Sequence, residues 1–217
     1  PAESNTPVEL GGRRLALTIC EDIWNAQDYW PVRLYRRDPI DELMRSGPGP
    51  GILCNISASP YHLGKERTRH DMLRAVAVKY KVPLAYCNLV GGNDELIFDG
   101  ESMVFDATGN LLARGAAFRE DLLVVDLNSS FIPHPSSFSS IAALHDALVL
   151  GLRDYVTKCG FKSVVLGLSG GIDSAVTACL AVAALGPQNV MGVSMPARYS
   201  SSGSLTDAEL LAKNLGI

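Results

Sequence analysis

Two short segments carry residues whose types and spacing could do chemistry. One is VVLGLSGGIDSA (164–175), in which paired glycines and two serines follow an apolar run. The other is LTICEDIW (17–24), in which Cys20 ends an apolar run. Main-chain N–H groups at a helix N-terminus bind anions, and a thiol at such a place ionises more easily. The first segment therefore predicts a phosphate-binding loop, and the second makes Cys20 a candidate nucleophile.

The glycine segment has the composition of a phosphate cradle. Gly170 and Gly171 let the backbone approach an anion closely, and Ser169 and Ser174 add hydroxyl donors. The segment lacks both the Gly-Lys-Ser/Thr of a Walker loop and the G-x-G-x-x-G dinucleotide spacing. Asp173 would repel a phosphate unless a divalent cation bridged them, and Mg²⁺ prefers oxygen ligands. The alternative is an ordinary helix N-terminus that carries turn-forming residues. The motif S-G-G-x-D-S would, however, occur by chance in a chain of this length with a probability on the order of 10⁻⁴ to 10⁻³.

The segment resembles the pyrophosphate loop of the ATP pyrophosphatase superfamily, whose members adenylate a carboxylate or carbonyl group and release pyrophosphate. The resemblance implies that ATP binds along the loop and that Asp173 helps to bind Mg²⁺. It also implies that the end of the next strand, at Met195 and residues 196–200, meets the adenosine. The implied ATP-binding residues are Gly167, Leu168, Ser169, Gly170, Gly171, Ile172, Asp173, Ser174 and Met195.

A lone cysteine is more often a small buried hydrophobic residue than a nucleophile. The four other cysteines lie in apolar runs, and we expect them in the core: Cys54, Cys87, Cys159 and Cys179. The sequence around Cys20 favours a catalytic role, because several segments resemble the nitrilase-type glutaminase domain that is fused to NAD synthetase. These segments are ICEDIW (19–24), NISASP (55–60) with Gly64-Lys65, GGNDELIFDG (91–100), and ALVLGLRDY (147–155) leading into the glycine loop.

The resemblance implies that Cys20 attacks the side-chain amide of glutamine, forms a glutamyl thioester and releases ammonia. Ser59 and Lys65 match the positions that hold glutamine, and Glu21 would help to orient the site. Taken without the family, Lys65 is as well explained as a solvated lysine in the first turn of a helix, and Glu21 as a surface acid. The triad's glutamate and lysine are expected upstream of this segment.

The composition excludes several classes of function. The 217 residues carry 19 Lys and Arg against 23 Asp and Glu, a net charge of −4, so the chain lacks the basic surface of a non-specific nucleic-acid binder. No apolar run approaches the roughly 20 residues that span a bilayer. The 5 cysteines, an odd number, do not form a disulfide framework. We expect a cytoplasmic protein that contacts neither nucleic acid nor membrane.

The secondary-structure elements that must position Cys20 are strands interrupted by a helix. Apolar runs predict buried strands at 14–19, 52–56, 83–89 and 122–127. Helical spacing over 65–80 places Met72, Leu73, Val76 and Ala77 on one apolar face. Residues 96–114 predict two or three strands with a turn at 106–110. Together these predict a mixed sheet in a layered α/β domain.

The elements around the glycine loop form a βαβ unit. We expect a helix over 140–158, a strand over 163–168, a helix over 172–185 and a strand over 190–194. A capping box at Thr206 and Glu209 predicts the start of a last helix. This order is typical of a doubly wound parallel sheet.

Domains, fold class and function follow from the resemblance. It implies the C-terminal portion of a nitrilase-like α-β-β-α sandwich (1–127), a Ser/Pro-rich linker (128–139) and the N-terminal portion of an adenine nucleotide α-hydrolase-like synthetase domain (140–217). The parent enzyme would use glutamine, ATP and deamido-NAD, with Mg²⁺, to make NAD, and would form a homo-oligomer. Residues that bind deamido-NAD are expected downstream, so the segment alone would be inactive. The alternatives are another amidotransferase or a tRNA-modifying enzyme of the ATP pyrophosphatase type, and a non-catalytic nitrilase-like scaffold.

Overall fold

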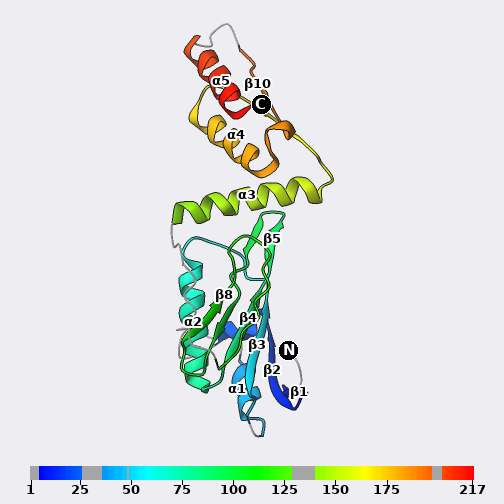
Figure 1. Ribbon diagram of the computed structural model, residues 1–217, viewed down its shortest axis with the longest axis vertical. Helices are drawn as coiled ribbons and strands as arrows, with labels where there is room; N and C mark the ends of the chain where they lie inside the picture. The colour runs from blue at the N-terminus through cyan, green and yellow to red at the C-terminus, as the bar shows by residue number, and fades with distance from the viewer. Residues whose placement is uncertain (1–4, 26–35, 48, 129–139, 197–201) are drawn as a thin grey trace. The chain divides into compact units, whose positions relative to one another are not determined.

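The computed structural model describes residues 5–25, 36–47, 49–128, 140–196 and 202–217 (Figure 1). The chain divides into two compact units. The first unit comprises Pro1–Val90 and Phe98–Ser140, and the second comprises Gly91–Ile97 and Ile141–Ile217. Almost all of the predicted linker, residues 129–139, lies outside the described residues.

The first unit is built on a six-stranded mixed sheet with the order β1-β2-β3-β4-β7-β8 (Figure 1). Its parallel centre consists of β2 (Arg13–Ile19), β3 (Ile52–Ser57) and β4 (Leu84–Asn88). The flanking strands run antiparallel to their neighbours and are β1 (Val8–Leu10), β7 (Met103–Phe105) and β8 (Leu111–Arg114). The predicted mixed sheet and the strands predicted at 14–19, 52–56 and 83–89 are thus confirmed.

The predicted strand at 122–127 is wrong. These residues form no strand, and the side chains of Leu122 and Val124 are 86% and 93% exposed. An apolar run becomes a strand only where a neighbouring strand takes its backbone hydrogen bonds. In the described part of the chain no strand pairs with residues 122–127.

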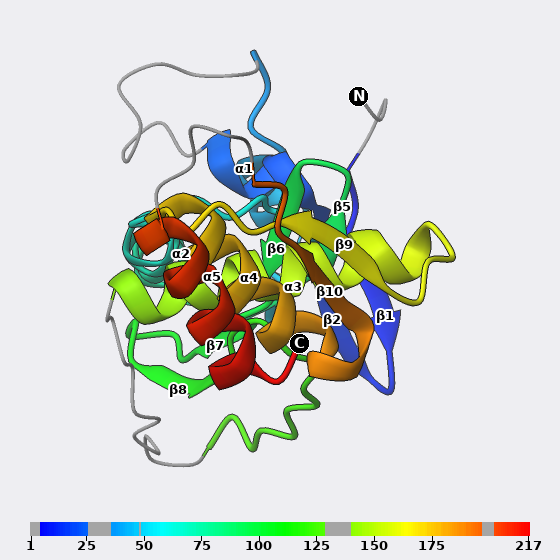
Figure 2. The same cartoon turned by 90° about the horizontal axis from the view of Figure 1, so that it is seen from above.

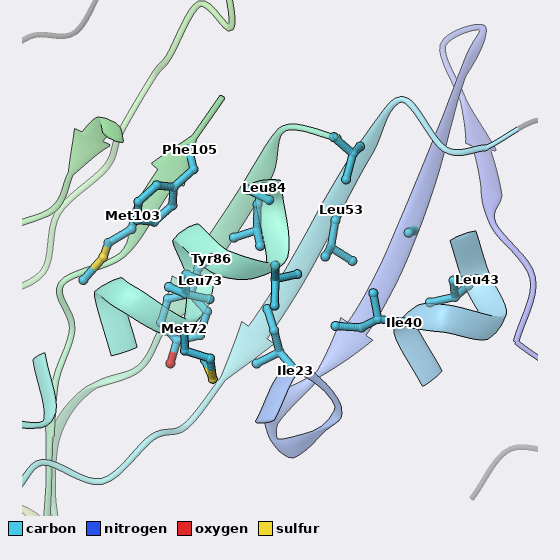
Figure 3. Packing of buried hydrophobic residues seen from close by; sticks show 14 residues of the cluster. Ile23, Ile40, Leu43, Leu53, Met72, Leu73, Leu84, Tyr86, Met103 and Phe105 are labelled. Carbon is cyan, nitrogen blue, oxygen red and sulfur yellow. The ribbon is translucent and has the colours of Figure 1, made fainter. Parts of the chain in front are cut away.

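Helix α2 (Lys65–Tyr80) has the predicted bounds and covers one face of the sheet. The four residues of its apolar face are buried, as their spacing predicts: Met72, Leu73, Val76 and Ala77. They pack with Leu53, Leu84 and Phe105 from the strands below (Figure 3). This core fixes α2, and with it Lys65 at its first turn, against the sheet.

Two short helices were not predicted. Helix η1 (Cys20–Asn25) directly follows β2, and α1 (Pro39–Arg45) precedes β3. The start of α1 is dictated locally, because the side chain of Asp38 accepts hydrogen bonds from the N–H groups of Ile40 and Asp41 at 3.1 and 3.2 Å. Pro39 occupies the first helical position. This Asp-Pro pair is a helix-start signal that could have been read from the sequence.

The expectation that the four other cysteines lie in the core is wrong. Cys87, Cys159 and Cys179 are exposed, and Cys54 is only half-buried. In the sheet the cause is alternation, because successive side chains point to opposite faces. The register places Cys87 beside Ile56, which in turn lies beside Ile19, on the face away from the core, where both isoleucines are also exposed.

The turn between β7 and β8 is confirmed at 106–110 and is organised by Asp106. Its carboxylate accepts hydrogen bonds from Thr108 N and Oγ1 and from Asn110 N and Nδ2, at 2.7 to 2.9 Å. Burial acts to raise the pKa of Asp106, but these hydrogen bonds outweigh it and lower the pKa to about 2.

We expect Asp106 to titrate near pH 2 in a carbon-detected NMR titration. Because its folded pKa lies below the ordinary value of 3.8, the stability that the ionised carboxylate adds to the turn is present above about pH 4 and is lost as the pH falls towards 2. Thr108→Val removes one donor and should raise the midpoint. An unchanged midpoint in that variant would contradict this account of the turn.

The second unit contains the expected βαβ order. Its elements are α3 (Ser140–Lys158), β9 (Val164–Gly167), α4 (Ile172–Leu185), η2 (Pro187–Asn189), β10 (Val190–Val193) and α5 (Ser202–Leu215). Strands β9 and β10 pair in parallel, and α4 contacts both strands and α5 (Figure 2). None of the described helices combines the length and apolarity that a membrane crossing needs.

The predicted start of the last helix is wrong. Helix α5 already includes Ser202, so Thr206 and Glu209 lie inside it and form no capping box. Gly170 approaches the backbone of Ser204 closely, which shows that the first turn of α5 packs against the glycine loop. Tertiary packing of this kind overrides the weak helix propensity of the Ser-Gly-Ser stretch at 202–204.

The second unit also contains the tip of a hairpin formed by β5 (Val90–Asn93) and β6 (Leu96–Asp99). Gly92 N donates to Asp154 Oδ2 at 2.7 Å, and Lys158 Nζ donates to Gly92 O at 2.5 Å. A Cβ on Gly151 would stand 2.9 Å from Ile97 Cδ1, so the glycine at position 151 lets the Ile97 side chain of the hairpin lie close against α3.

Candidate functional site

Cys20 occupies a strained turn where β2 passes into η1. Its φ is +49°, a left-handed value that is uncommon for any residue other than glycine. Asp22 holds this turn, since its Oδ2 accepts a hydrogen bond from Ile19 N at 2.8 Å. Backbone strain of this kind clusters at functional sites. The half-buried thiol thus stands at the carboxyl end of a central parallel strand.

A row of buried polar groups lies beside Cys20. Asn55 on β3 donates to Thr18 Oγ1 at 2.9 Å, and Ser57 donates to Asn55 Oδ1 at 2.8 Å. Thr18 in turn donates to the carbonyl of Cys54 at 3.2 Å. Polar groups that are buried and paired fix the ends of β2 and β3 in one arrangement. The backbone that presents Cys20 is therefore rigidly supported.

Lys65 is half-buried near the cysteine. Its Nζ donates to the carbonyl of Pro60 at 2.7 Å and lies 5.4 Å from the ring centre of Trp24. Burial and then the like charge of Arg69 lower the pKa of Lys65, while Asp99 and Cys20 act in the opposite direction. The lysine is therefore partly removed from water and is not a simple solvated side chain. Glu21 is exposed on η1, and its role stays a prediction.

Ser59 is buried in the loop after β3. Its N–H donates to Asn88 Oδ1 at 3.0 Å, but among the residues that the structure describes its own Oγ finds no hydrogen-bond partner of acceptable geometry. The neighbouring Tyr86 phenol has its pKa raised by burial, with Ser57, Arg69 and Ser59 acting against this rise. The Ser59 hydroxyl therefore lies near that phenol without completing a good hydrogen bond. A buried hydroxyl without a partner is available for a ligand.

Sequence reasoning missed a buried charge cluster next to this loop. Arg69, fully buried on α2, donates to both oxygens of Asp99 at 3.0 and 2.7 Å and to Glu101 at 3.1 Å. Arg114 also pairs with Glu101. Burial raises the pKa of Glu101, while the two arginines act against this rise. The signal was available, since Arg69 shares the helical spacing of Met72 and the other apolar residues of α2.

The glycine loop joins β9 to α4 and is closed by its serines. Ser174 Oγ accepts from Ser169 N at 3.3 Å and donates to the carbonyl of Gly171 at 2.9 Å, and Gly171 N donates to Ser169 Oγ at 3.2 Å. Gly171 is the N-cap of α4 and provides no side-chain cap. The first-turn N–H groups of α4 thus lack a side-chain acceptor at the N-cap, which is the arrangement that receives an anion.

Close packing requires a glycine at one position of the loop and places Met195 beside another glycine, at the end of β9. A Cβ on Gly170, whose φ is +79°, would overlap the carbonyl group of Ser204. A Cβ on Gly167 would stand 3.3 Å from Met195 Cε. The structure therefore brings Met195 beside the start of the loop, at the shared carboxyl edge of β9 and β10. Residues 197–200 of the predicted adenosine-binding segment lie outside the described residues.

The donor set fits ATP with Mg²⁺ better than a metal ion held by protein alone. In the ranges that the structure describes, no three His, Cys, Asp or Glu side chains cluster as metal ligands. Asp173 is exposed in the first turn of α4, beside the uncapped N-terminus. Mg²⁺ in nucleotide sites takes one or two carboxylates and completes its shell with phosphates and water. A single carboxylate at this position meets that need.

Each of the two candidate sites lies in a part of the chain that matches a known protein family. Residues 2–133, more than half of the chain, match the family described as carbon-nitrogen hydrolase. The chain belongs to the carbon-nitrogen hydrolase family. Residues 144–217, which hold the glycine loop, match the NAD synthase family. The fold-class prediction of a nitrilase-like part followed by an NAD synthetase part is confirmed.

Curated relatives combine the same two parts. The glutamine-dependent NAD(+) synthetase of Synechocystis sp. is 44% identical over 210 residues, covering 94% of this chain and 37% of the relative. That of Thermotoga maritima is 41% identical over 254 residues, covering 100% of this chain and 42% of the relative. This chain therefore spans about two fifths of the length of the relatives that it matches.

A solved structure shows the same arrangement of elements. The glutamine-dependent NAD+ synthetase from Acinetobacter baumannii, in complex with adenosine diphosphate, has a TM-score of 0.83 and 32% identity to this chain. The match covers 100% of this chain and 40% of that structure. A glutamine-dependent NAD(+) synthetase from Cytophaga hutchinsonii has the same fold, with a TM-score of 0.74 and 21% identity.

Proposed function

We propose that this chain carries the glutamine-hydrolysing nucleophile and the ATP loop of a glutamine-dependent NAD synthetase. The observation that supports this most strongly is the presence of both sites in one chain. Cys20 lies on a left-handed turn at the end of a parallel strand, and an uncapped glycine loop opens α4. The two sites follow each other in the order of the carbon-nitrogen hydrolase and NAD synthase matches.

At the first site, the Cys20 thiolate attacks the side-chain amide carbon of glutamine. The tetrahedral intermediate expels ammonia and leaves a glutamyl thioester, which water hydrolyses to glutamate and the free thiol. Lys65 pairs with the α-carboxylate of glutamine, the Ser59 hydroxyl donates a hydrogen bond to the substrate, and Glu21 helps to orient it. A glutamate would take the thiol proton and a lysine would complete the triad, and neither role is assigned to a residue of this chain.

At the second site, the glycine loop holds the phosphates of ATP through the N–H groups of α4 and the hydroxyls of Ser169 and Ser174. The nicotinate carboxylate of deamido-NAD attacks the α-phosphorus, and pyrophosphate leaves. Ammonia from the first site then attacks the adenylate and displaces AMP, which gives NAD. When bound, Mg²⁺ would neutralise phosphate charge, with Asp173 as its protein ligand, while Met195 contacts the adenosine.

The domain boundaries, location and partners belong to the same proposal. Residues 1–127 form the glutaminase part and 140–217 the synthetase part, joined by 128–139. The protein acts on small molecules in the cytoplasm, without nucleic acid, and assembles with copies of itself. The acidic balance of 19 Lys and Arg against 23 Asp and Glu supports the absence of a nucleic-acid partner.

The Cys20→Ala variant tests this proposal in the protein that carries this chain. With deamido-NAD and Mg·ATP supplied, we expect glutamine-driven NAD formation to fall by about 10³-fold or more, since no other nucleophile replaces the thiol. The reaction driven by ammonium should continue, because the synthetase loop is untouched. Cys87→Ala, an exposed cysteine outside the site, is the control and should leave both reactions unchanged. Absence of NAD formation with either nitrogen donor in the wild type would refute the function.

A further inference from the structure

Asn88, at the end of β4, uses every hydrogen-bonding position of its side-chain amide. Its Oδ1 accepts from Ser59 N at 3.0 Å and from the Tyr86 hydroxyl at 3.3 Å. Its Nδ2 donates to Asp99 Oδ1 at 3.1 Å and to the carbonyl of Gly100 at 2.8 Å. The orientation of the amide is unambiguous, because the Ser59 N–H can only donate and the Gly100 carbonyl can only accept.

The partners of Asn88 make it an immobile anchor. Asp99, which receives one of its N–H groups, is itself held by the two-pronged contact with the fully buried Arg69. Asn88 and Asp99 are 7% and 1% exposed, so water does not compete for these bonds. A satisfied polar network inside a core holds one geometry. Through its Oδ1, Asn88 also accepts the hydrogen bond from the Ser59 N–H.

The Ser59 loop depends on this anchor for its course. Between β3 and α2, Ser59 binds Asn88, and Pro60 forms an isolated bridge with Phe98. The Pro60 carbonyl then receives the ammonium group of Lys65. One short stretch of backbone thus determines the positions of the two groups assigned to glutamine, which are the Ser59 hydroxyl and the Lys65 ammonium. The side-chain amide of Asn88 holds this stretch against β4.

We propose that Asn88 is a positioning residue for glutamine: it holds Ser59 and, through Pro60, Lys65 in the geometry that binds the substrate. This inference rests on the function proposed above and assigns Asn88 no contact with the reacting atoms. Cys20 is supported separately, by Asp22 and the Thr18–Asn55 pair. Loss of the anchor therefore weakens glutamine binding without changing the nucleophile.

The test is glutaminase kinetics of Asn88→Leu in the protein that carries this chain. We expect the KM for glutamine to rise about 10- to 100-fold with kcat within about threefold, the signature of lost substrate binding. Alkylation of Cys20 by iodoacetamide, followed on its own peptide by mass spectrometry, should keep its rate. If Asn88→Leu does not fold, the smaller Asn88→Ser should show the same split.

Two further variants separate positioning from general damage. Ser102→Ala removes the hydroxyl that accepts a hydrogen bond from the main-chain N–H of Asn88 at 3.1 Å but leaves the amide network intact, so its KM should be unchanged. Ser59→Ala should raise KM, and the pair Asn88→Leu with Ser59→Ala should raise it little more than Asn88→Leu alone, because the two residues act as a unit.

An unchanged KM in Asn88→Leu, or additive effects in the double variant, would overturn the inference. Parallel losses of kcat, Cys20 alkylation and the ammonium-driven reaction would also overturn it, because they would show a structural role only. A wild-type protein that does not hydrolyse glutamine would instead overturn the proposed function and the inference with it.

Discussion

Replacing Gly170 with alanine should abolish NAD formation with both nitrogen donors while leaving glutamine hydrolysis intact. Position 170 has a φ of +79°, and an added Cβ would stand 2.7 Å from Ser204 Cα and overlap the adjoining carbonyl. Backbone atoms cannot rotate away as a side chain can, so either the loop or the first turn of α5 must shift. We expect kcat/KM for ATP to fall about 100-fold or more, or about 2.7 kcal/mol.

Gly160→Ala is the matched control for this substitution. Gly160 has nearly the same φ, +80°, but an added Cβ there meets no atom of the described residues within 4 Å. It therefore reports backbone strain alone, which costs about 1 kcal/mol of stability without moving the loop. NAD formation in Gly170→Ala at the rate of the Gly160→Ala protein would contradict the steric account.

Replacing Arg69 with methionine should cause the largest loss of stability in the first unit. The side chain is fully buried, and its removal leaves Asp99 without its cation and Glu101 with Arg114 alone. Removing one partner of a buried ion pair costs about 3–5 kcal/mol. In a domain of this size that lowers the midpoint of thermal unfolding by about 6–20 °C.

The pH dependence of this loss has a definite sign. Burial already raises the pKa of Glu101, and removing Arg69 raises it further. A carboxyl group with a raised folded pKa binds its proton more tightly in the folded state, so its contribution to stability grows as the pH falls through that pKa. The deficit of Arg69→Met should therefore be smaller at pH 5 than at pH 8 in thermal melts.

Arg37→Met provides the comparison for Arg69→Met. Arg37 also pairs with a carboxylate, Glu42, at 2.6 Å, but its side chain is 51% exposed. Exposed ion pairs contribute little, so the melting midpoint should move by no more than about 2 °C. Equal losses in the two variants would show that burial of the Arg69 cluster is not what makes it matter.

The sequence predicted the elements with strong periodicity, because burial of one face imposes that periodicity. Helix α2 and the parallel strands β2, β3 and β4 follow the apolar pattern of their own residues. The predicted strand at 122–127 has the same kind of pattern but no pairing partner in the described ranges. The local pattern of apolar residues indicates which side chains avoid water. It does not indicate whether a neighbouring strand is available to take the backbone hydrogen bonds.

The candidate sites show the same limit. Cys20, Lys65 and the glycine loop could be singled out because their residue types and neighbours in the chain suggest chemistry. Asn88 could not, because its role arises from Ser59 and Asp99, which are 29 and 11 positions away in the chain. Besides its positive φ, Gly170 is constrained by the close approach of Ser204, which lies on α5. Such long-range contacts become visible only in the folded chain.

The assignment of residues 91–97 to the second unit has a consequence for the design of chimeras in this family. These residues belong to the second unit, while the chain on both sides of them belongs to the first, so the polypeptide passes between the units at 90/91, 97/98 and 140/141. A chimera joined only near residue 140 would combine an α3 from one species with a hairpin tip from another. The contacts of Gly92 with Asp154 and Lys158, and the close approach of Ile97 to Gly151, must then be inherited together.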